Sequence, residues 1–122
     1  ESIDIIISFY TLEHILKIDE HIDFYKKKLK VGGTLVGAIP NEGGVLWGLG
    51  RLLTTYRAMT KMGFNYNKVF CWEHPNTCDR VVAKLNCSGL SQVILGQKPF
   101  SWLRFYDFNL ITSFAFIKNK SE

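Results

Sequence analysis

The sequence predicts an α/β fold with a parallel sheet, on three observations. An isoleucine-rich run comes first, a helical pattern of apolar residues follows, and a second apolar run comes directly after a Gly-Gly pair. Strand, helix, tight turn and strand in this order form a βαβ unit, whose strands lie parallel with a right-handed connection. The 122 residues, 47% of them hydrophobic, suit one domain with its own core.

The βαβ unit accounts for the first third of the chain. Residues 3–9, IDIIISF, are a continuous apolar run, typical of a parallel strand covered on both faces. Residues 12–30 are predicted to form the helix, since apolar residues recur there every three or four positions: Ile15, Ile18, Ile22, Tyr25 and Leu29. Glycines in VGG at 31–33 end the helix, and TLVGAI at 34–39 is the second strand.

Two more helices are expected after a loop, NEGG, at residues 41–44. Residues 45–62 have an amphipathic pattern with regularly spaced leucines. The sequence EHPN at 73–76 looks like the entry to another helix, with Asn76 as its N-cap. Val82 and Leu85 of that helix are expected to face the core.

Two further strands complete the prediction. They are SQVIL at about 91–95 and LITSFAFI at 110–117. The second is apolar on both faces, which favours a place in the interior of the sheet over an edge. No repeat or linker divides the chain.

Charge, cysteine content and hydrophobic run length indicate which partners and which compartment to expect. The net charge is a modest +4, and the run KKKLK at 26–30 holds four of the basic residues without aromatic residues interleaved for base stacking, so no nucleic-acid partner is expected. Three cysteines without CxxC spacing suit reduced thiols in a cytoplasmic protein. No apolar run is long enough for a membrane span, and no export leader is recognisable.

Two stretches carry a resemblance to a known family. SIDIIISFYTLEHI at 2–15 and LKVGGTLVGAIP at 29–40 resemble the second half of class I S-adenosylmethionine-dependent methyltransferases. In that family an acid and an apolar strand lead to a Leu-Glu-His loop, and the next helix ends in a Leu-Lys-Pro-Gly-Gly turn. Asp4, Leu12-Glu13-His14 and Leu29–Gly33 occupy those places, with Val31 instead of proline. The closing NLITSFAFIKN looks like the family's antiparallel seventh strand.

The resemblance implies half of a Rossmann-like seven-stranded sheet, namely strands four to seven, with an inserted lid helix. Residues 1–122 would then be the C-terminal portion of a single methyltransferase domain. The family's glycine-rich cofactor loop and ribose-binding acid would precede residue 1, so the chain is expected to be a fragment that is inactive alone. The intact enzyme would use S-adenosylmethionine to methylate a small-molecule acceptor, whose identity the sequence leaves open.

The resemblance also implies site residues at the carboxyl end of the first strand, where ligands bind in open α/β sheets. Ser8, Phe9 and Tyr10 would line the cofactor pocket, and His14 would accept a proton if the acceptor must lose one. The alternative is that these residues have only structural roles: Phe9 and Tyr10 would pack against other side chains, and His14 would cap a helical turn.

Substrate contacts are expected from the loop after the second strand and from the lid. They are Pro40, Asn41 and Glu42 with Gly43, then Trp47, Arg51, Tyr56 and Arg57, and finally His74. For residues 45–62 three interpretations stay open: a substrate-gripping lid, a helix packed on the core, and an interfacial helix in peripheral contact with a membrane. Cys71, His74 and Cys78 lack a fourth ligand for zinc, so no metal is expected.

A non-catalytic α/β module is the alternative function. Residues 3–9 would form a long apolar edge strand, and such an edge pairs readily with another chain. The isolated chain is therefore expected to dimerise, to swap strands or to aggregate.

Overall fold

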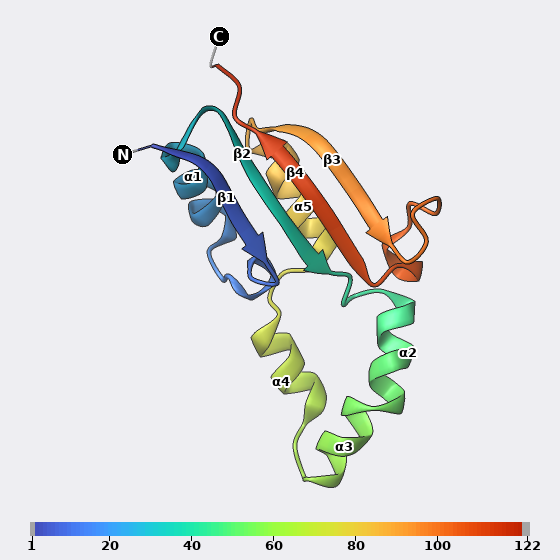
Figure 1. Ribbon diagram of the computed structural model, residues 1–122. Coiled ribbons are helices and arrows are strands. Elements are labelled where there is room, and N and C mark those ends of the chain that lie inside the picture. Colours follow the sequence, from blue (N-terminus) through green and yellow to red (C-terminus); the bar gives the residue numbers. More distant parts are fainter. Residues whose placement is uncertain (1, 121–122) are drawn as a thin grey trace.

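The computed structural model describes residues 2–120, so residues 1 and 121–122 of the predicted domain lie outside the described part. Figure 1 shows a twisted sheet with helices behind it and a helical projection at one end. The strands are β1 (Ile3–Phe9), β2 (Leu29–Pro40), β3 (Ser91–Lys98) and β4 (Ile111–Ile117). The helices are α1 (Ile18–Lys28), α2 (Val45–Leu53), α3 (Thr55–Lys61), α4 (Tyr66–Glu73) and α5 (Cys78–Cys87), with short 3-10 turns at Leu12–His14 and Tyr106–Phe108.

The sheet has the strand order β1-β2-β4-β3. β1 and β2 are parallel, as the βαβ prediction requires, and Ser8 is the register partner of Gly37. β4 runs antiparallel to both β2 and β3 and lies between them. The predictions that the last strand is antiparallel and belongs in the sheet interior are confirmed.

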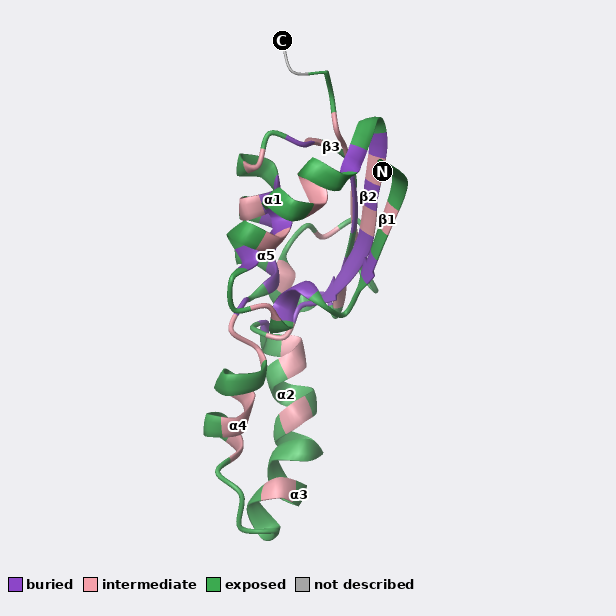
Figure 2. Ribbon diagram, turned by 90° about the vertical axis from the view of Figure 1, so that its left-hand side faces the viewer, coloured by how far each residue is buried: buried purple, intermediate pink, exposed green. Residues whose placement is uncertain are grey.

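The helices α1 and α5 cover one face of the sheet, and the core lies between them and the strands (Figure 2). Ile18 and Ile22 of α1 are buried there, as the helical spacing predicted. Val82 and Leu85 of α5 are also buried, which confirms their expected orientation. The strands contribute Leu35, Ile39, Phe114 and Phe116.

The opposite face of the sheet is bare in the described chain (Figure 2). Alternate residues of β1 point to it and are exposed: Ile3, Ile5, Ile7 and Phe9. The prediction that this strand is covered on both faces is therefore wrong for these residues. The apolar run identified the strand correctly, but burial of a second face needs elements that residues 2–120 do not supply.

The predicted helices differ from those of the structure in three respects. The helix expected at 12–30 begins only at Ile18, after a 3-10 turn, and ends at Lys28, because Leu29 already has an extended backbone. The helix expected at 45–62 breaks at Thr54 into α2 and α3. Helix α4 was not predicted at all.

Asn76 is not an N-cap. Thr77 occupies the N-cap position of α5, while the buried Asn76 side chain donates hydrogen bonds to the carbonyl oxygens of Leu12 (3.2 Å) and Ile15 (2.6 Å). Asn76 therefore ties the 3-10 turn after β1 to the start of α5. Its long-range partners explain the error, since a local capping pattern contains no information about them.

None of the helices among residues 2–120 has both the length and the apolar character needed to cross a membrane.

Candidate functional site

The candidate site lies where β1 and β2 end. The strands are parallel, so their carboxyl ends meet at the same edge of the sheet, and the loops that follow them lie side by side. Helix α4 returns to this edge from the projection, as Figure 1 shows. The site therefore combines three segments: the turn after β1, the loop after β2 and the end of α4.

Two histidines and two carboxylates form the centre of the site. The rings of His14 and His74 make an edge-on contact with centroids 4.4 Å apart. The Nδ1 atom of His74 is hydrogen-bonded to Oε2 of Glu42. The Nε2 atom of His14 lies 3.9 Å from Oε1 of Glu13. Residues 13 and 74 are far apart in sequence, and only the fold brings them together.

The hydrogen bonds fix how each imidazole presents its nitrogens. Nδ1 of His14 lies 2.7 Å from the carbonyl oxygen of Glu73, which can only accept, so this nitrogen carries the proton and donates. Nδ1 of His74 likewise donates to the carboxylate of Glu42. In both neutral rings, Nε2 is then left as an acceptor. The site thus holds two imidazoles that can take up a proton.

A cavity of about 350 Å³ opens beside this cluster, between α2, α3 and α4. Its lining combines aromatic, apolar and charged groups: Glu42, Trp47, Arg51, Thr55, Met59, Tyr66, Val69, Phe70, Glu73 and His74. The guanidinium carbon of Arg51 lies 3.9 Å from the centre of the Phe70 ring, a cation–π contact. Arg51 also donates through Nη2 to the carbonyl oxygen of Glu42, while its Nη1 is buried without a protein partner.

Burial shifts the proton affinities of the site. The pKa of Glu42 is raised mainly by desolvation, although the positive charge of Arg51 opposes the shift. The pKa of His74 is lowered, again mainly by desolvation and further by the charge of His14. Burial thus shifts both groups in the direction of their uncharged forms.

Glu13 is an unusual carboxylate among the described residues. It is only 2% exposed, and its Oε2 atom has no hydrogen-bond partner. Desolvation raises its pKa, and a hydrogen bond to the backbone and the nearby His14 offset only part of this. A buried charged oxygen without a partner costs stability, which evolution tolerates mostly at sites of function.

Replacing Glu13 with glutamine is expected to stabilise the protein by about 1 kcal/mol at neutral pH, because the buried negative charge disappears. The folded-state pKa lies above the ordinary value of 4.5, so the wild type loses stability as the pH rises from that value through the raised one. Urea denaturation near pH 4 and near pH 7 measures the difference, which should vanish at the lower pH. Glu20→Gln, at an exposed carboxylate paired with Lys17, should change stability little at either pH. Equal effects of the two substitutions at both pH values would contradict the assignment.

The residues expected to line the cofactor pocket all lie at the carboxyl end of β1. Ser8 is buried with an unpartnered hydroxyl, whereas the rings of Phe9 and Tyr10 are exposed. Tyr10 has a left-handed backbone, with φ of 50°, where the chain turns away from the strand. These groups can form one wall of a nucleoside site. Among the described residues, no glycine-rich loop stands beside them to complete a cradle.

The structure places the expected substrate residues in two groups. Glu42, Trp47, Arg51 and His74 line the 350 Å³ cavity. Tyr56 is outside that lining and packs edge-on against Tyr66 with centroids 5.6 Å apart.

Pro40 and Asn41 are buried at the end of β2, and each is engaged with β4. The Asn41 side chain accepts a hydrogen bond of 2.7 Å from Thr112 Oγ1 and fixes the loop that carries Glu42. Trp47 lines the cavity and is also tied to the segment before β4, because its Nε1 donates a hydrogen bond of 2.6 Å to the carbonyl oxygen of Leu110.

Sequence reasoning missed two aromatic contributors from α4, Tyr66 and Phe70. They lie four residues apart, and the expected His74, the C-cap of α4, follows Phe70 at the same interval, so the three share one face. Asn65 caps the helix by accepting from the Lys68 amide. The rings of Phe70 and His74 are 5.0 Å apart. The spacing of these aromatic residues, the asparagine cap and the terminal Pro75 together form a signal that could have revealed this helix.

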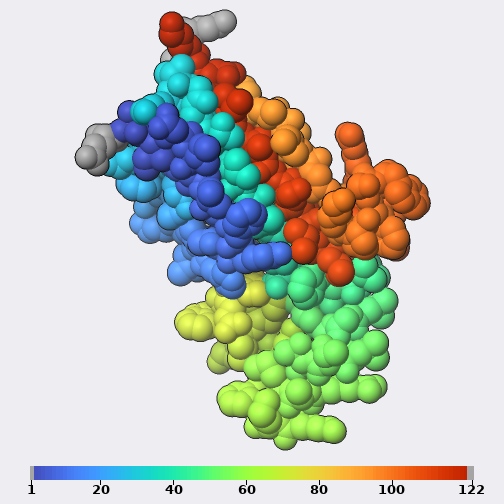
Figure 3. All heavy atoms as spheres, in the orientation of Figure 1, coloured from blue at the N-terminus to red at the C-terminus, as the bar shows by residue number. Residues whose placement is uncertain are grey.

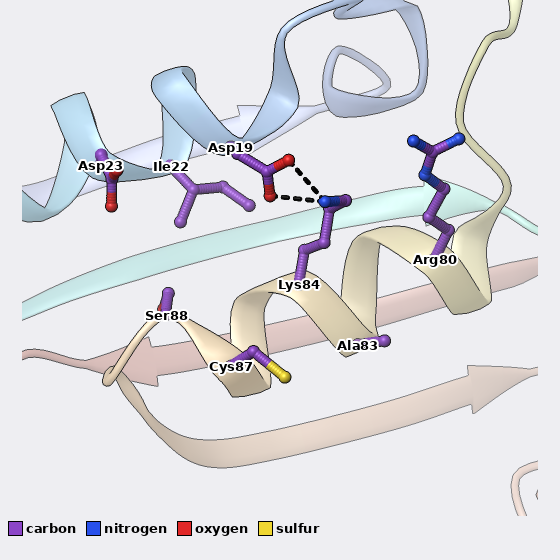
Figure 4. A pocket seen from close by; sticks show the side chains of 8 residues that line it. All are labelled: Asp19, Ile22, Asp23, Arg80, Ala83, Lys84, Cys87 and Ser88. Atoms are coloured by element: carbon purple, nitrogen blue, oxygen red, sulfur yellow. Dashed lines mark hydrogen bonds and ion pairs between the residues drawn. The ribbon is translucent and has the colours of Figure 1, made fainter.

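Another cavity, of about 470 Å³, lies on the outer surface of the helix layer (Figure 4). Asp19 of α1 and Lys84 of α5 form an ion pair across it, with Nζ 2.6 Å from Oδ1. This groove is an ordinary helix–helix seam away from the sheet edge. Within residues 2–120, no three histidine, cysteine, aspartate or glutamate side chains, those of the His14–His74 cluster included, are placed so that they could hold one metal ion.

Comparison with known proteins identifies the fold. No protein-family model and no curated protein matches the sequence. Among solved structures, the N-methyltransferase NodS from Bradyrhizobium japonicum matches 98% of this chain with a TM-score of 0.57 and 20% identity, and its complex with S-adenosyl-L-homocysteine matches 99% with a TM-score of 0.60 and 19% identity. A methyltransferase from Thermotoga maritima, described as a possible histamine N-methyltransferase, matches 98% with a TM-score of 0.61 and 18% identity.

The chain spans only about half of these proteins: 53% and 48% of the two NodS chains and 57% of the Thermotoga chain. At such low identity the likeness concerns the fold alone. The described residues therefore have a mixed α/β architecture that matches the Rossmann-like methyltransferase fold.

Proposed function

We propose that this chain is the C-terminal half of an S-adenosylmethionine-dependent methyltransferase domain and that the intact domain methylates a small-molecule acceptor in the cytoplasm. The observation that carries the proposal is the cluster of His14, Glu42 and His74 beside a 350 Å³ cavity. It lies at the sheet edge where α/β folds bind ligands. The match of the fold to methyltransferase structures supports it.

Two features support the assignment to one half of a domain, with the strands corresponding to four to seven of a seven-stranded sheet. The match covers about half of each neighbouring structure. In addition, β1 is an edge strand with a bare apolar face, which the other half of such a sheet and its helices would cover. Ser8, Phe9 and Tyr10 would then meet the cofactor from one side, and the missing half would supply its glycine-rich loop.

The acceptor would occupy the cavity between the sheet edge and helices α2 to α4. Aromatic rings of Trp47, Tyr66 and Phe70 provide flat apolar walls, and Glu42 and Glu73 provide acceptors for an N–H or O–H group. The two-helix segment α2–α3 would act as the lid of this cavity.

Bound S-adenosylmethionine would supply an electrophilic methyl group on a sulfonium. The chain's own contribution is positioning and proton transfer. Nε2 of His14, oriented by the bond from Nδ1 to the Glu73 carbonyl, would accept the proton that the acceptor loses. The Glu42–His74 pair would orient the acceptor beside it.

Calorimetric titration with S-adenosylmethionine tests the proposal. The 122-residue chain should give little heat, whereas a form extended upstream to a complete domain should bind the cofactor. Absence of binding by an extended form that is folded would contradict the enzyme assignment.

A non-catalytic association module remains the second candidate, favoured by the exposure of Ile5 and Ile7 on the edge strand. On that interpretation the extended form would bind no cofactor, while the 122-residue chain would elute as a dimer in size-exclusion chromatography. Elution as a soluble, folded monomer would count against this candidate.

A further inference from the structure

The segment from residue 45 to residue 72, here called the helical arm, projects from the sheet. It contains α2, α3 and most of α4 and extends beyond the carboxyl ends of β1 and β2 (Figure 1). In the space-filling view it forms the green and yellow lower part of the molecule (Figure 3). Not one of its residues is buried, although the segment is rich in leucine and aromatic residues.

All of the chain's net charge resides in the arm. Its charged residues are Arg51, Arg57, Lys61 and Lys68, and it contains no aspartate or glutamate. The rest of the sequence has eleven basic and eleven acidic residues, which balance. Arg57, Lys61 and Lys68 are exposed, whereas Arg51 is turned inward against Phe70. The arm therefore presents purely positive charge to solvent.

The arm also exposes an organised apolar surface. Val45, Leu49, Leu52 and Leu53 are spaced i, i+4, i+7 and i+8, so they share one face of α2. Each is 50–64% exposed, because the inward face of this helix is the one with Trp47 and Arg51. Met62 and Phe64 at the turn after α3, and Trp72 near the end of α4, are exposed as well.

We propose that the helical arm docks on a membrane surface that contains anionic lipid. Leucine and aromatic side chains enter the boundary between headgroups and acyl chains, while lysine and arginine pair with anionic headgroups. The arm combines both properties in one segment without an opposing charge, and the neutral remainder of the chain does not. Membrane docking depends on the arm and not on methyl transfer. The docking proposal and the methyltransferase proposal can therefore fail independently of each other.

Co-sedimentation with lipid vesicles tests the inference. The 122-residue chain should bind vesicles of phosphatidylcholine and phosphatidylglycerol and should bind pure phosphatidylcholine much more weakly. Added salt should reduce the binding, since the basic side chains act through screened charge. Equal binding to both kinds of vesicle, or to neither, would overturn the proposal.

Paired variants separate the arm from other surfaces. Arg57→Glu with Lys61→Glu should weaken binding tenfold or more, because each basic residue near an anionic surface contributes substantially. Lys27→Glu with Lys28→Glu, an identical charge change on exposed residues of α1, should have a much smaller effect. If both pairs weaken binding equally, net charge and not the arm is responsible, and the proposal is wrong.

The contribution of the exposed leucines to vesicle binding is tested with a separate pair of variants. Leu52→Ser with Leu53→Ser should weaken binding severalfold. Ile5→Ser with Ile7→Ser, at comparably exposed positions on the bare sheet face, should not. The opposite outcome would assign lipid binding to the sheet face and overturn the role of the arm. Circular dichroism of each variant verifies that the helices are retained.

Discussion

Replacement of Gly37 with alanine should lower the free energy of unfolding by about 3 kcal/mol, and valine should abolish folding at ordinary temperature. Gly37 lies in β2 opposite Ser8 of β1 and Phe114 of β4. A Cβ atom at this position would overlap with the carbonyl oxygen of Ser8 and approach Cζ of Phe114 to 2.5 Å. The carbonyl is backbone and the ring is only 1% exposed, so neither can move without opening the sheet or the core.

The matched control is Gly50→Ala in α2. Nothing lies within 4 Å of the position of its added Cβ, and alanine is the better helix former. This substitution should raise the free energy of unfolding by about 0.5–1 kcal/mol. Urea denaturation of both variants measures the contrast. A small or equal effect at the two positions would show that β1 does not pack on β2 as closely as described.

On the proposed function, loss of the His14 imidazole should reduce kcat of the upstream-extended form by about 10²–10⁴-fold, the range typical of a missing general base. The reason is the tautomer: the Glu73 carbonyl accepts from Nδ1–H, so Nε2 is left as the nitrogen that can accept a proton. His14→Gln keeps a polar group of similar reach but cannot accept the proton. KM for S-adenosylmethionine should change little, because the effect falls on a step after binding.

His21→Gln provides the control for this measurement. His21 lies in α1 and packs edge-on against Tyr25, away from the site, with ring centroids 4.5 Å apart. Its replacement should leave kcat unchanged. An unchanged kcat in His14→Gln would remove His14 from the chemistry, while equal losses in both variants would indicate a general effect on folding.

Glu42 and His74 illustrate how far the candidate site could be predicted. The sequence predicted both as substrate contacts, and both line the cavity. Their hydrogen bond was beyond prediction, because it joins residues separated by 32 positions and depends on the return of α4 to the sheet edge. The sequence identified Glu13 only as part of a Leu-Glu-His motif. It did not predict that the carboxylate is buried with one oxygen atom lacking a hydrogen-bond partner.

The sequence alone determined the order and type of the main elements. A local apolar run predicts a strand, and apolar residues at every third or fourth position predict a helix. Short stretches of sequence were therefore enough to predict five elements: β1, α1, β2, α5 and the interior strand β4. Tertiary structure decided which faces of these elements are buried, which carbonyl groups the Asn76 side chain bonds to, and where the helical segment breaks between α2 and α3. Those properties depend on partners distant in the chain. The contrast is sharpest for β1, whose residues specify a strand but cannot specify what covers its second face.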